Sequence, residues 1–164
     1  MRRRILFACL SSLLVFTVLW TDVNAQTLFG YSGTFVRRKL ARTQTAGSQI
    51  SAANAWVTVP SAILSYTVPS GTSDLFNVTF SAECTKILGG AARIRVIDTV
   101  SGGVVALQPY DGGQAFCSSG SVATYTGTWL RRSGAGTHTL QVQINQTGGV
   151  TAIDDWTFEL VVYD

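Results

Sequence analysis

One ten-residue stretch, residues 75–84, constrains the fold more than any other part of the chain. Its even-numbered residues are all apolar, and from Asn77 onward the odd-numbered residues between them are all polar. A period of two is typical of a β-strand with one buried face, because successive side chains point to opposite sides of a sheet. Cys84 belongs to the apolar set. The sequence therefore predicts that the Cys84 side chain points into the core.

Short strand-like segments recur along the rest of the chain, and glycine, proline, serine and asparagine separate them. The clearest are residues 28–36, 56–60, 62–69, 93–97, 104–107, 123–129, 137–144 and 156–162. No convincing amphipathic helix pattern occurs after residue 25. Many short strands joined by such turns predict an all-β protein. Within this class we expect an antiparallel β-sandwich, and more specifically a jelly roll.

The N-terminus has the pattern of a secretory signal peptide. Three arginines, residues 2–4, precede an apolar run from Ile5 to Leu19, and small residues at 23–25 suit a signal peptidase. We expect cleavage after Ala25, so that residues 26–164 form one β-sandwich domain. An uncleaved membrane anchor is the alternative, since the apolar run is nearly long enough to span a bilayer. The cleaved protein is expected outside the membrane, as a secreted, periplasmic or cell-surface protein.

Charge excludes some classes of partner. The chain has 12 Lys and Arg and 9 Asp and Glu residues, and the predicted mature part keeps nine and eight of these, a net charge of +1. This balance gives no indication of a nucleic-acid partner. One basic group stands out: Arg37, Arg38, Lys39 and Arg42. It is either a patch for an anionic polymer or a solvent-exposed strand end. We favour the strand end, because no aromatic residues alternate with these charges.

Cysteine usage agrees with export. Cys9 leaves with the signal peptide, so Cys84 and Cys117 remain. In an exported protein, two cysteines predict a single disulfide. A metal-binding pair of thiolates is the alternative. Their spacing is too wide for a zinc knuckle and only His138 could help, so no metal is predicted there.

Motifs that carry chemistry are absent from the sequence. There is no nucleophile elbow, no phosphate-binding glycine loop and no metalloprotease helix. The single histidine, His138, shares the parity of Leu140 and Val142, which favours a structural role over a general base. Catalysis normally needs a nucleophile, a base and a stabilising group. We therefore expect a non-catalytic protein. The enzymatic alternative is a small hydrolase that uses carboxylates from among Asp98, Asp111, Asp154 and Asp155.

Asp154 and Asp155 allow a second interpretation, as part of a calcium site. Calcium binds carboxylate oxygens, so this site would need Asp98 or Asp111 to converge on the same end of the domain. Adjacent residues of a strand point to opposite faces, which argues against a catalytic pair. We favour a turn that starts the last strand. Apart from calcium, no cofactor is predicted.

Aromatic residues suggest a carbohydrate ligand, because sugar rings stack on flat exposed rings. Most of the tryptophans and tyrosines follow the parity of buried residues, so burial is expected for them. Tyr110, beside Asp111 in a glycine-rich loop, is the best candidate for an exposed ring. The candidate ligand-binding loops are therefore those that carry Tyr110, Asp111, Asp154 and Asp155.

Four segments together carry a resemblance to known proteins: residues 56–60, 80–84, 136–143 and 154–163. This combination resembles small exported bacterial proteins of unknown function and covers most of the predicted mature chain. The closing strands are also similar to jelly rolls of the complement-head and tumour-necrosis-factor type. That similarity, which concerns the fold alone, implies loops that bind partners and assembly into trimers. We thus expect an interaction or assembly module, which forms a homo-oligomer or binds a protein or cell-envelope partner. A glycan-binding module is the alternative.

Overall fold

A computed structural model describes residues 35–50, 55–87, 92–107, 115–117 and 121–164 of the chain. Every regular element in these ranges is a strand. No helix in these ranges has the length and apolar character needed to cross a membrane. The strands are β1 (Val36–Gln44), β2 (Ser48–Ile50), β3 (Trp56–Lys86), β4 (Ala92–Val100), β5 (Gly103–Ala106), β6 (Ala115–Cys117), β7 (Ala123–Gln146) and β8 (Thr151–Tyr163). The predicted signal peptide, Tyr110 and Asp111 lie outside the described residues.

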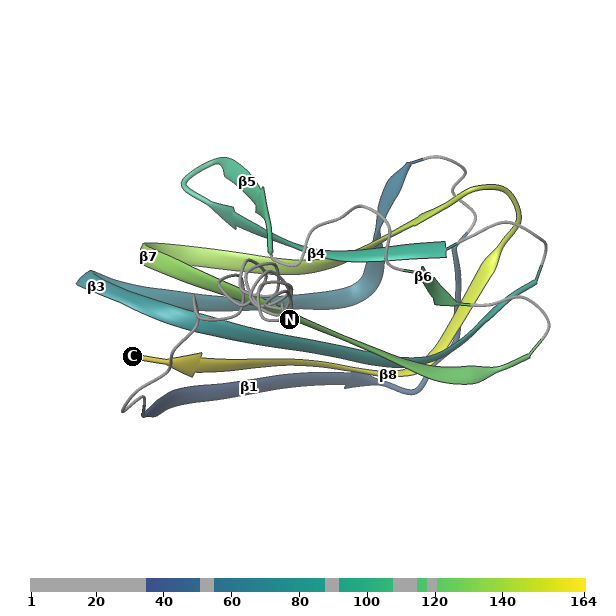
Figure 1. Ribbon diagram of the computed structural model, residues 1–164, viewed down its shortest axis with the longest axis horizontal. Helices are drawn as coiled ribbons and strands as arrows, with labels where there is room; N and C mark the ends of the chain where they lie inside the picture. Colours follow the sequence, from purple (N-terminus) through teal and green to yellow (C-terminus); the bar gives the residue numbers. More distant parts are fainter. Residues whose placement is uncertain (1–34, 51–54, 88–91, 108–114, 118–120) are drawn as a thin grey trace, which may run out of the picture. The chain divides into compact units, whose positions relative to one another are not determined.

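The two longest strands, β3 and β7, each double back and so pass from one layer of the domain to the other. The first arm of β3, residues 56–68, pairs with the second arm of β7, residues 136–145. The second arm of β3, residues 73–84, pairs with the first arm of β7, residues 123–134. Figure 1 shows both ribbons doubling back at the left. This fold-over converts one continuous set of hydrogen bonds into two facing layers.

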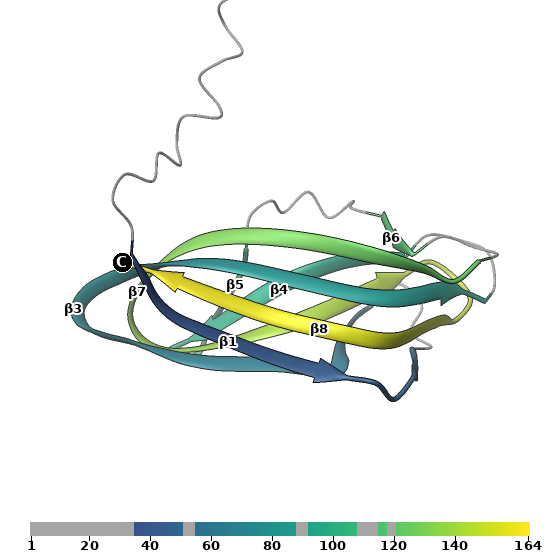
Figure 2. The same ribbon diagram turned by 90° about the horizontal axis from the view of Figure 1, so that it is seen from below.

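The order of the strands identifies the fold. Layer 1 runs β1, β8, second arm of β3, first arm of β7. Layer 2 runs first arm of β3, second arm of β7, β4, β5. We number these segments along the chain, counting the two arms of β3 and of β7 separately and leaving out the short strands β2 and β6. The two layers then follow the orders 1-8-3-6 and 2-7-4-5, and every pair is antiparallel. This is the strand order of a jelly roll, which confirms the predicted fold class. Figure 2 shows β1, β8 and β3 of layer 1 side by side.

The core lies between the two layers and is formed by the apolar faces that the sequence predicted. The even-numbered residues from 76 to 84 are all buried, and so are those from 156 to 162 and from 140 to 144. The ring of Phe80 packs near the rings of Phe116, Trp156 and Phe158, with centroid distances of 5.7, 5.9 and 6.2 Å. Burial of such side chains contributes about 1.5–3 kcal/mol each. The hydrophobic effect therefore holds the two layers together.

The predicted disulfide is present. It joins Cys84, in the second arm of β3, to Cys117 in β6, with the two Cα atoms 5.9 Å apart. β6 pairs with β4 of layer 2, so the disulfide links the two layers. Both cysteines are buried.

The first strand differs from the expectation. Residues 28–34 lie outside the described part of the chain, and β1 runs from Val36 to Gln44. The basic group therefore lies along a strand instead of at a strand end. Arg38 and Arg42 can occupy this strand because β1 is the edge of layer 1, where both faces reach solvent. Basic residues on an edge strand also oppose pairing with another sheet.

Candidate functional site

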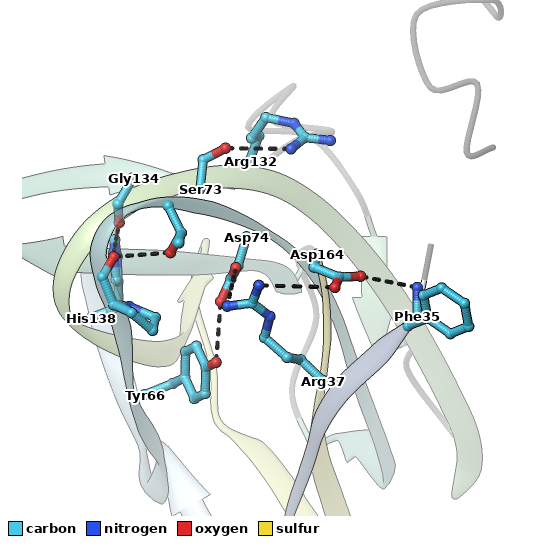
Figure 3. Close-up of polar contacts among 11 residues, drawn as sticks. Phe35, Arg37, Tyr66, Ser73, Asp74, Arg132, Gly134, His138 and Asp164 are labelled. Atoms are coloured by element: carbon cyan, nitrogen blue, oxygen red, sulfur yellow. Dashed lines mark hydrogen bonds and ion pairs between the residues drawn. The ribbon is translucent and has the colours of Figure 1, made fainter. Parts of the chain in front are cut away.

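Ionisable side chains gather at the end of the domain where β3 and β7 double back. We call this group the corner cluster; its members are Arg37, Tyr66, Asp74, Asp98, Arg131 and His138. Figure 3 shows part of it around Asp74 and His138. Asp74 and Asp98 are fully buried, and His138 is 2% exposed. Buried charges are costly unless they are paired, so the geometry of each carboxylate matters.

One half of the corner cluster is built around Asp98. Its Oδ2 atom lies 2.8 Å from Nδ1 of His138 and 3.5 Å from Nε of Arg131. The other ring nitrogen of His138, Nε2, lies 2.8 Å from the carbonyl oxygen of Gly134. A carbonyl oxygen can only accept, so Nε2 carries a proton and donates it to Gly134. Both ring nitrogens of His138 are therefore occupied within the protein, and neither faces a substrate.

The other half is built around Asp74. The Tyr66 hydroxyl donates to Oδ2 of Asp74 over 3.1 Å, and Nη1 of Arg37 lies 3.4 Å from Oδ1. Burial, together with the hydrogen bond to Asp74 and its negative charge, raises the pKa of Tyr66 above 10.0. Arg37 also reaches Asp164, whose Oδ1 accepts a hydrogen bond from the backbone N–H of Phe35. These contacts fasten the start of β1 to the end of β8.

A phenylalanine links the two halves. The ring of Phe76 meets the rings of Tyr66 and His138 edge to face, at centroid distances of 5.8 and 5.1 Å. Tyr66 belongs to layer 2 and Asp74 to layer 1, while Arg131 belongs to layer 1 and Asp98 to layer 2. Each buried carboxylate therefore has one partner in its own layer and one in the opposite layer. The corner cluster closes the end of the hydrophobic core with polar contacts between layers.

The predicted basic group is largely engaged with the protein itself. Lys39 forms an ion pair with Glu159 at 3.4 Å. Nη1 of Arg42 donates to the carbonyl oxygens of Ser61 and Ile63, at 3.2 and 3.3 Å. These carbonyls lie where the ladder between β3 and β7 is interrupted. Arg42 thus ties β1 to the edge of layer 2. Binding of an anionic polymer, the less favoured alternative for this group, is not tested by these contacts.

The structure places Asp154 and Asp155 inside β8 at a β-bulge, not in a turn before the strand. Glu83 pairs with Asp154 and Ala82 with Trp156, so Asp155 is the extra residue and has a φ of 41°. The turn was expected wrongly because the ladder with β3 continues to Lys86 and includes this segment. Both aspartates are exposed, and Oδ1 of Asp154 accepts from the N–H of Asp155.

The calcium hypothesis gains no ligand from Asp98, because that buried carboxylate contacts His138 and Arg131. Within the described ranges, no three His, Cys, Asp or Glu side chains lie close enough together to hold a metal ion. Asp111, the other carboxylate considered for calcium, lies outside those ranges, and so does Tyr110, the candidate ring for a sugar ligand.

Sequence reasoning missed several buried polar residues, although a signal for them exists. Each one extends the parity of an apolar run by one step, so that it points inward at one end of that run. They are Asp74 before Phe76, Lys86 after Cys84, Asp98 after Val96, and Gln146 after Ile144. A polar residue at such a position indicates a buried site that is filled by hydrogen bonds instead of apolar contacts.

Comparison with known proteins assigns no family. No family model matches the chain, and neither does any curated protein. The chain is similar to two solved structures of infectious bursal disease virus. The Gx strain structure has 14% sequence identity and a TM-score of 0.43, with coverage of 79% of this chain and 32% of that chain. The Gt strain structure has 11% identity and a TM-score of 0.40, with coverage of 79% and 38%. The chain therefore spans about a third of the viral chains that it matches.

Proposed function

We propose that the protein is an exported, non-catalytic module that acts by binding a partner or by self-assembly. The inward orientation of the corner cluster supports this proposal. Its carboxylates and its histidine are buried and paired with one another, with arginines and with a tyrosine. A catalytic base or nucleophile must reach its substrate. The surface is therefore the part of the domain that is left to act.

The observation that carries the proposal is the composition of the outer side of layer 1. We call this surface the hydroxyl face; its residues are Thr43, Thr79, Ser81, Thr124, Thr126, Thr128 and Thr157. Across the four strands, Thr43 pairs with Thr157, Thr157 with Ser81, and Ser81 with Thr126. The hydroxyls of Ser81 and Thr126 lie 2.9 Å apart. These hydroxyl side chains carry no charge, so a partner of matching shape can cover them at low cost. Charged residues of the same outer side flank them, because Glu83 pairs with Thr124 and Glu159 pairs with Thr79.

Solution mass tests the proposal directly. We expect the oxidised chain 26–164 to form a closed oligomer, such as a trimer, when it is measured by light scattering on a sizing column. Thr126→Arg places a charge on the hydroxyl face, in the first arm of β7, and is expected to shift the mass to that of a monomer. The control is Thr137→Arg, on the outer side of layer 2. A wild-type monomer at all concentrations contradicts self-assembly, and equal effects of both variants contradict the hydroxyl face.

A carbohydrate-binding module is the second candidate, and one observation favours it. Trp56 lies on the outer side of layer 2 and is half-buried. The guanidinium carbon of Arg95 lies 4.1 Å from the centroid of its ring, and Nε of Arg95 donates to Oε1 of Gln143 over 2.8 Å. An aromatic ring beside guanidinium and amide groups offers both stacking and hydrogen bonds to a sugar.

A glycan array separates the two candidates. If the second is right, wild-type protein binds a defined set of glycans and Trp56→Ala loses that binding. Thr67→Ala, an exposed change elsewhere on the same outer side, is the control and should bind normally. Silence across the array counts against the carbohydrate function and leaves self-assembly or a protein partner.

A further inference from the structure

A buried lysine ends the second arm of β3. Lys86 is 2% exposed and continues the inward parity of Ala82 and Cys84. Its Nζ atom donates to the carbonyl oxygen of Gly148 over 2.6 Å and to Oε1 of Gln146 over 3.4 Å. In the described part of the chain, no carboxylate forms an ion pair with it. Burial lowers the pKa of the Lys86 amine, which favours the neutral, nucleophilic form.

The carboxamide beside this lysine is held in one orientation. Gln146 is 1% exposed, and its Nε2 donates to the carbonyl oxygens of Ile50 and Gly149, at 2.5 and 3.0 Å. Both of these partners are carbonyl oxygens, which only accept, so the atom of the Gln146 carboxamide that contacts them is the nitrogen. Oε1 therefore faces the donors. These donors are the Lys86 amine and the hydroxyl of Thr151, which lies directly across the β3–β8 ladder from Lys86. A nucleophile and a polarised carbonyl group thus meet in a water-poor site.

We propose that Lys86 and Gln146 form an intramolecular isopeptide bond. The lone pair of Lys86 Nζ attacks Cδ of Gln146, and negative charge develops on Oε1, where the Thr151 hydroxyl donates a hydrogen bond. The bond between Cδ and Nε2 then breaks. Nε2 leaves as ammonia and takes the proton that the attacking nitrogen loses. A primary amine and a primary amide give a secondary amide and ammonia, so no oxidant, reductant or further reactant is needed.

The bond would join the two layers. Lys86 ends the second arm of β3 in layer 1, and Gln146 ends the second arm of β7 in layer 2, 60 residues away in sequence. The Cys84–Cys117 disulfide links the layers two residues before Lys86. Burial keeps water away from Cδ of Gln146, which suppresses competing hydrolysis. This proposal is independent of the proposed function.

Mass spectrometry of the reduced, denatured chain tests the proposal. We expect a mass about 17 Da below that of the sequence, which is the loss of one ammonia. An N-terminal glutamine, such as Gln26 after signal cleavage, can cyclise with the same loss. A tryptic map separates the two. The isopeptide bond blocks cleavage after Lys86, so we expect residues 43–93 joined to residues 133–164 as one species that lacks ammonia.

Variants make the assignment specific. Lys86→Met should yield separate peptides, and Thr151→Val should leave a larger fraction without the bond after the same incubation. The control is Gln143→Ala, on the same strand but on its outer face, and it should keep the cross-link. Separate wild-type peptides 43–86 and 133–164, whether unmodified or with Gln146 deamidated, in both fresh and aged protein would overturn the proposal.

Discussion

At the scale of single residues, the corner cluster shows how the fold tolerates buried charge. The Tyr66 hydroxyl donates to one oxygen of Asp74, while the other oxygen forms no hydrogen bond. Tyr66→Phe removes that donor and leaves the carboxylate with Arg37. A hydrogen bond to a charged group contributes about 1.5–3 kcal/mol. We expect the variant to lose that much free energy of unfolding near neutral pH, measured by urea denaturation. An unchanged midpoint would contradict the assigned role of the hydroxyl.

The same residue predicts a response to alkaline pH. The pKa of Tyr66 is raised above its ordinary value of 10.0, first by burial and then by Asp74. The unfolded chain therefore loses the Tyr66 proton at lower pH than the folded chain does. Its contribution to stability is complete below pH 10.0 and is lost as the pH rises through the folded pKa. We expect the free energy of unfolding to fall above pH 10.0 in the wild type. The fall should be shallower in Tyr66→Phe, and parallel curves would contradict this.

What the sequence could predict at this scale follows from parity. His138 was expected inside because it shares the side of Leu140, and it is buried. Its partner Asp98 could not be found in this way, because the contact depends on how β4 and β7 are aligned. Local sequence pattern is even less able to predict the contact between Arg131 and Asp98, since the two residues come from opposite layers. Tertiary contacts of this kind need the topology first.

At the scale of strands, one glycine of β7 leaves the space that a buried tryptophan occupies. Gly127 lies two residues before Trp129 on the same side, and a Cβ atom at Gly127 would come within 2.4 Å of the indole ring. Gly127→Ala forces the buried Trp129 out of its place. Overpacking of this kind costs about 1–3 kcal/mol. We expect that loss in the free energy of unfolding, with a change in near-ultraviolet circular dichroism from the displaced indole.

Gly134 provides the matched control for this prediction. It lies in the same strand, and a Cβ atom there would meet nothing within 4 Å. Gly134→Ala also keeps the carbonyl oxygen that His138 contacts. Its stability should stay within about 0.5 kcal/mol of the wild type. A larger loss for Gly134→Ala than for Gly127→Ala would show that the indole is not what limits position 127.

Strand existence was more predictable than strand extent. Alternation predicted segments at 123–129 and 137–144, and both belong to β7. Alternation cannot show that they form one strand that doubles back, because the backbone is extended on both sides of the fold-over. Gly136, with a φ of 136°, lies at the fold-over. The basic residues of β1 were misplaced for a related reason. An exposed edge strand needs no apolar face, so its sequence looks like a loop.

At the scale of the whole domain, the disulfide and the hydrophobic core hold the same two layers. Cys84 and Cys117 are 33 residues apart in sequence, and closing such a loop in the unfolded chain stabilises the fold by about 3.5 kcal/mol on the chain-entropy argument. We expect the double variant Cys84→Ala, Cys117→Ala to lose about that much. Chemical denaturation of the oxidised wild type and of the double variant measures the difference.

The proposed isopeptide bond changes this figure, and the change tests both covalent links together. With Lys86 joined to Gln146, a second covalent path of similar length connects Cys84 to Cys117 in the unfolded chain. Each halving of the effective loop length lowers the entropic free-energy cost of closing it by about 0.6 kcal/mol. Loss of the disulfide should therefore cost about 0.6 kcal/mol more in the Lys86→Met background than in the wild type. Equal costs in the two backgrounds would mean that the unfolded wild-type chain carries no second link, because an existing link must shorten the loop that the disulfide closes.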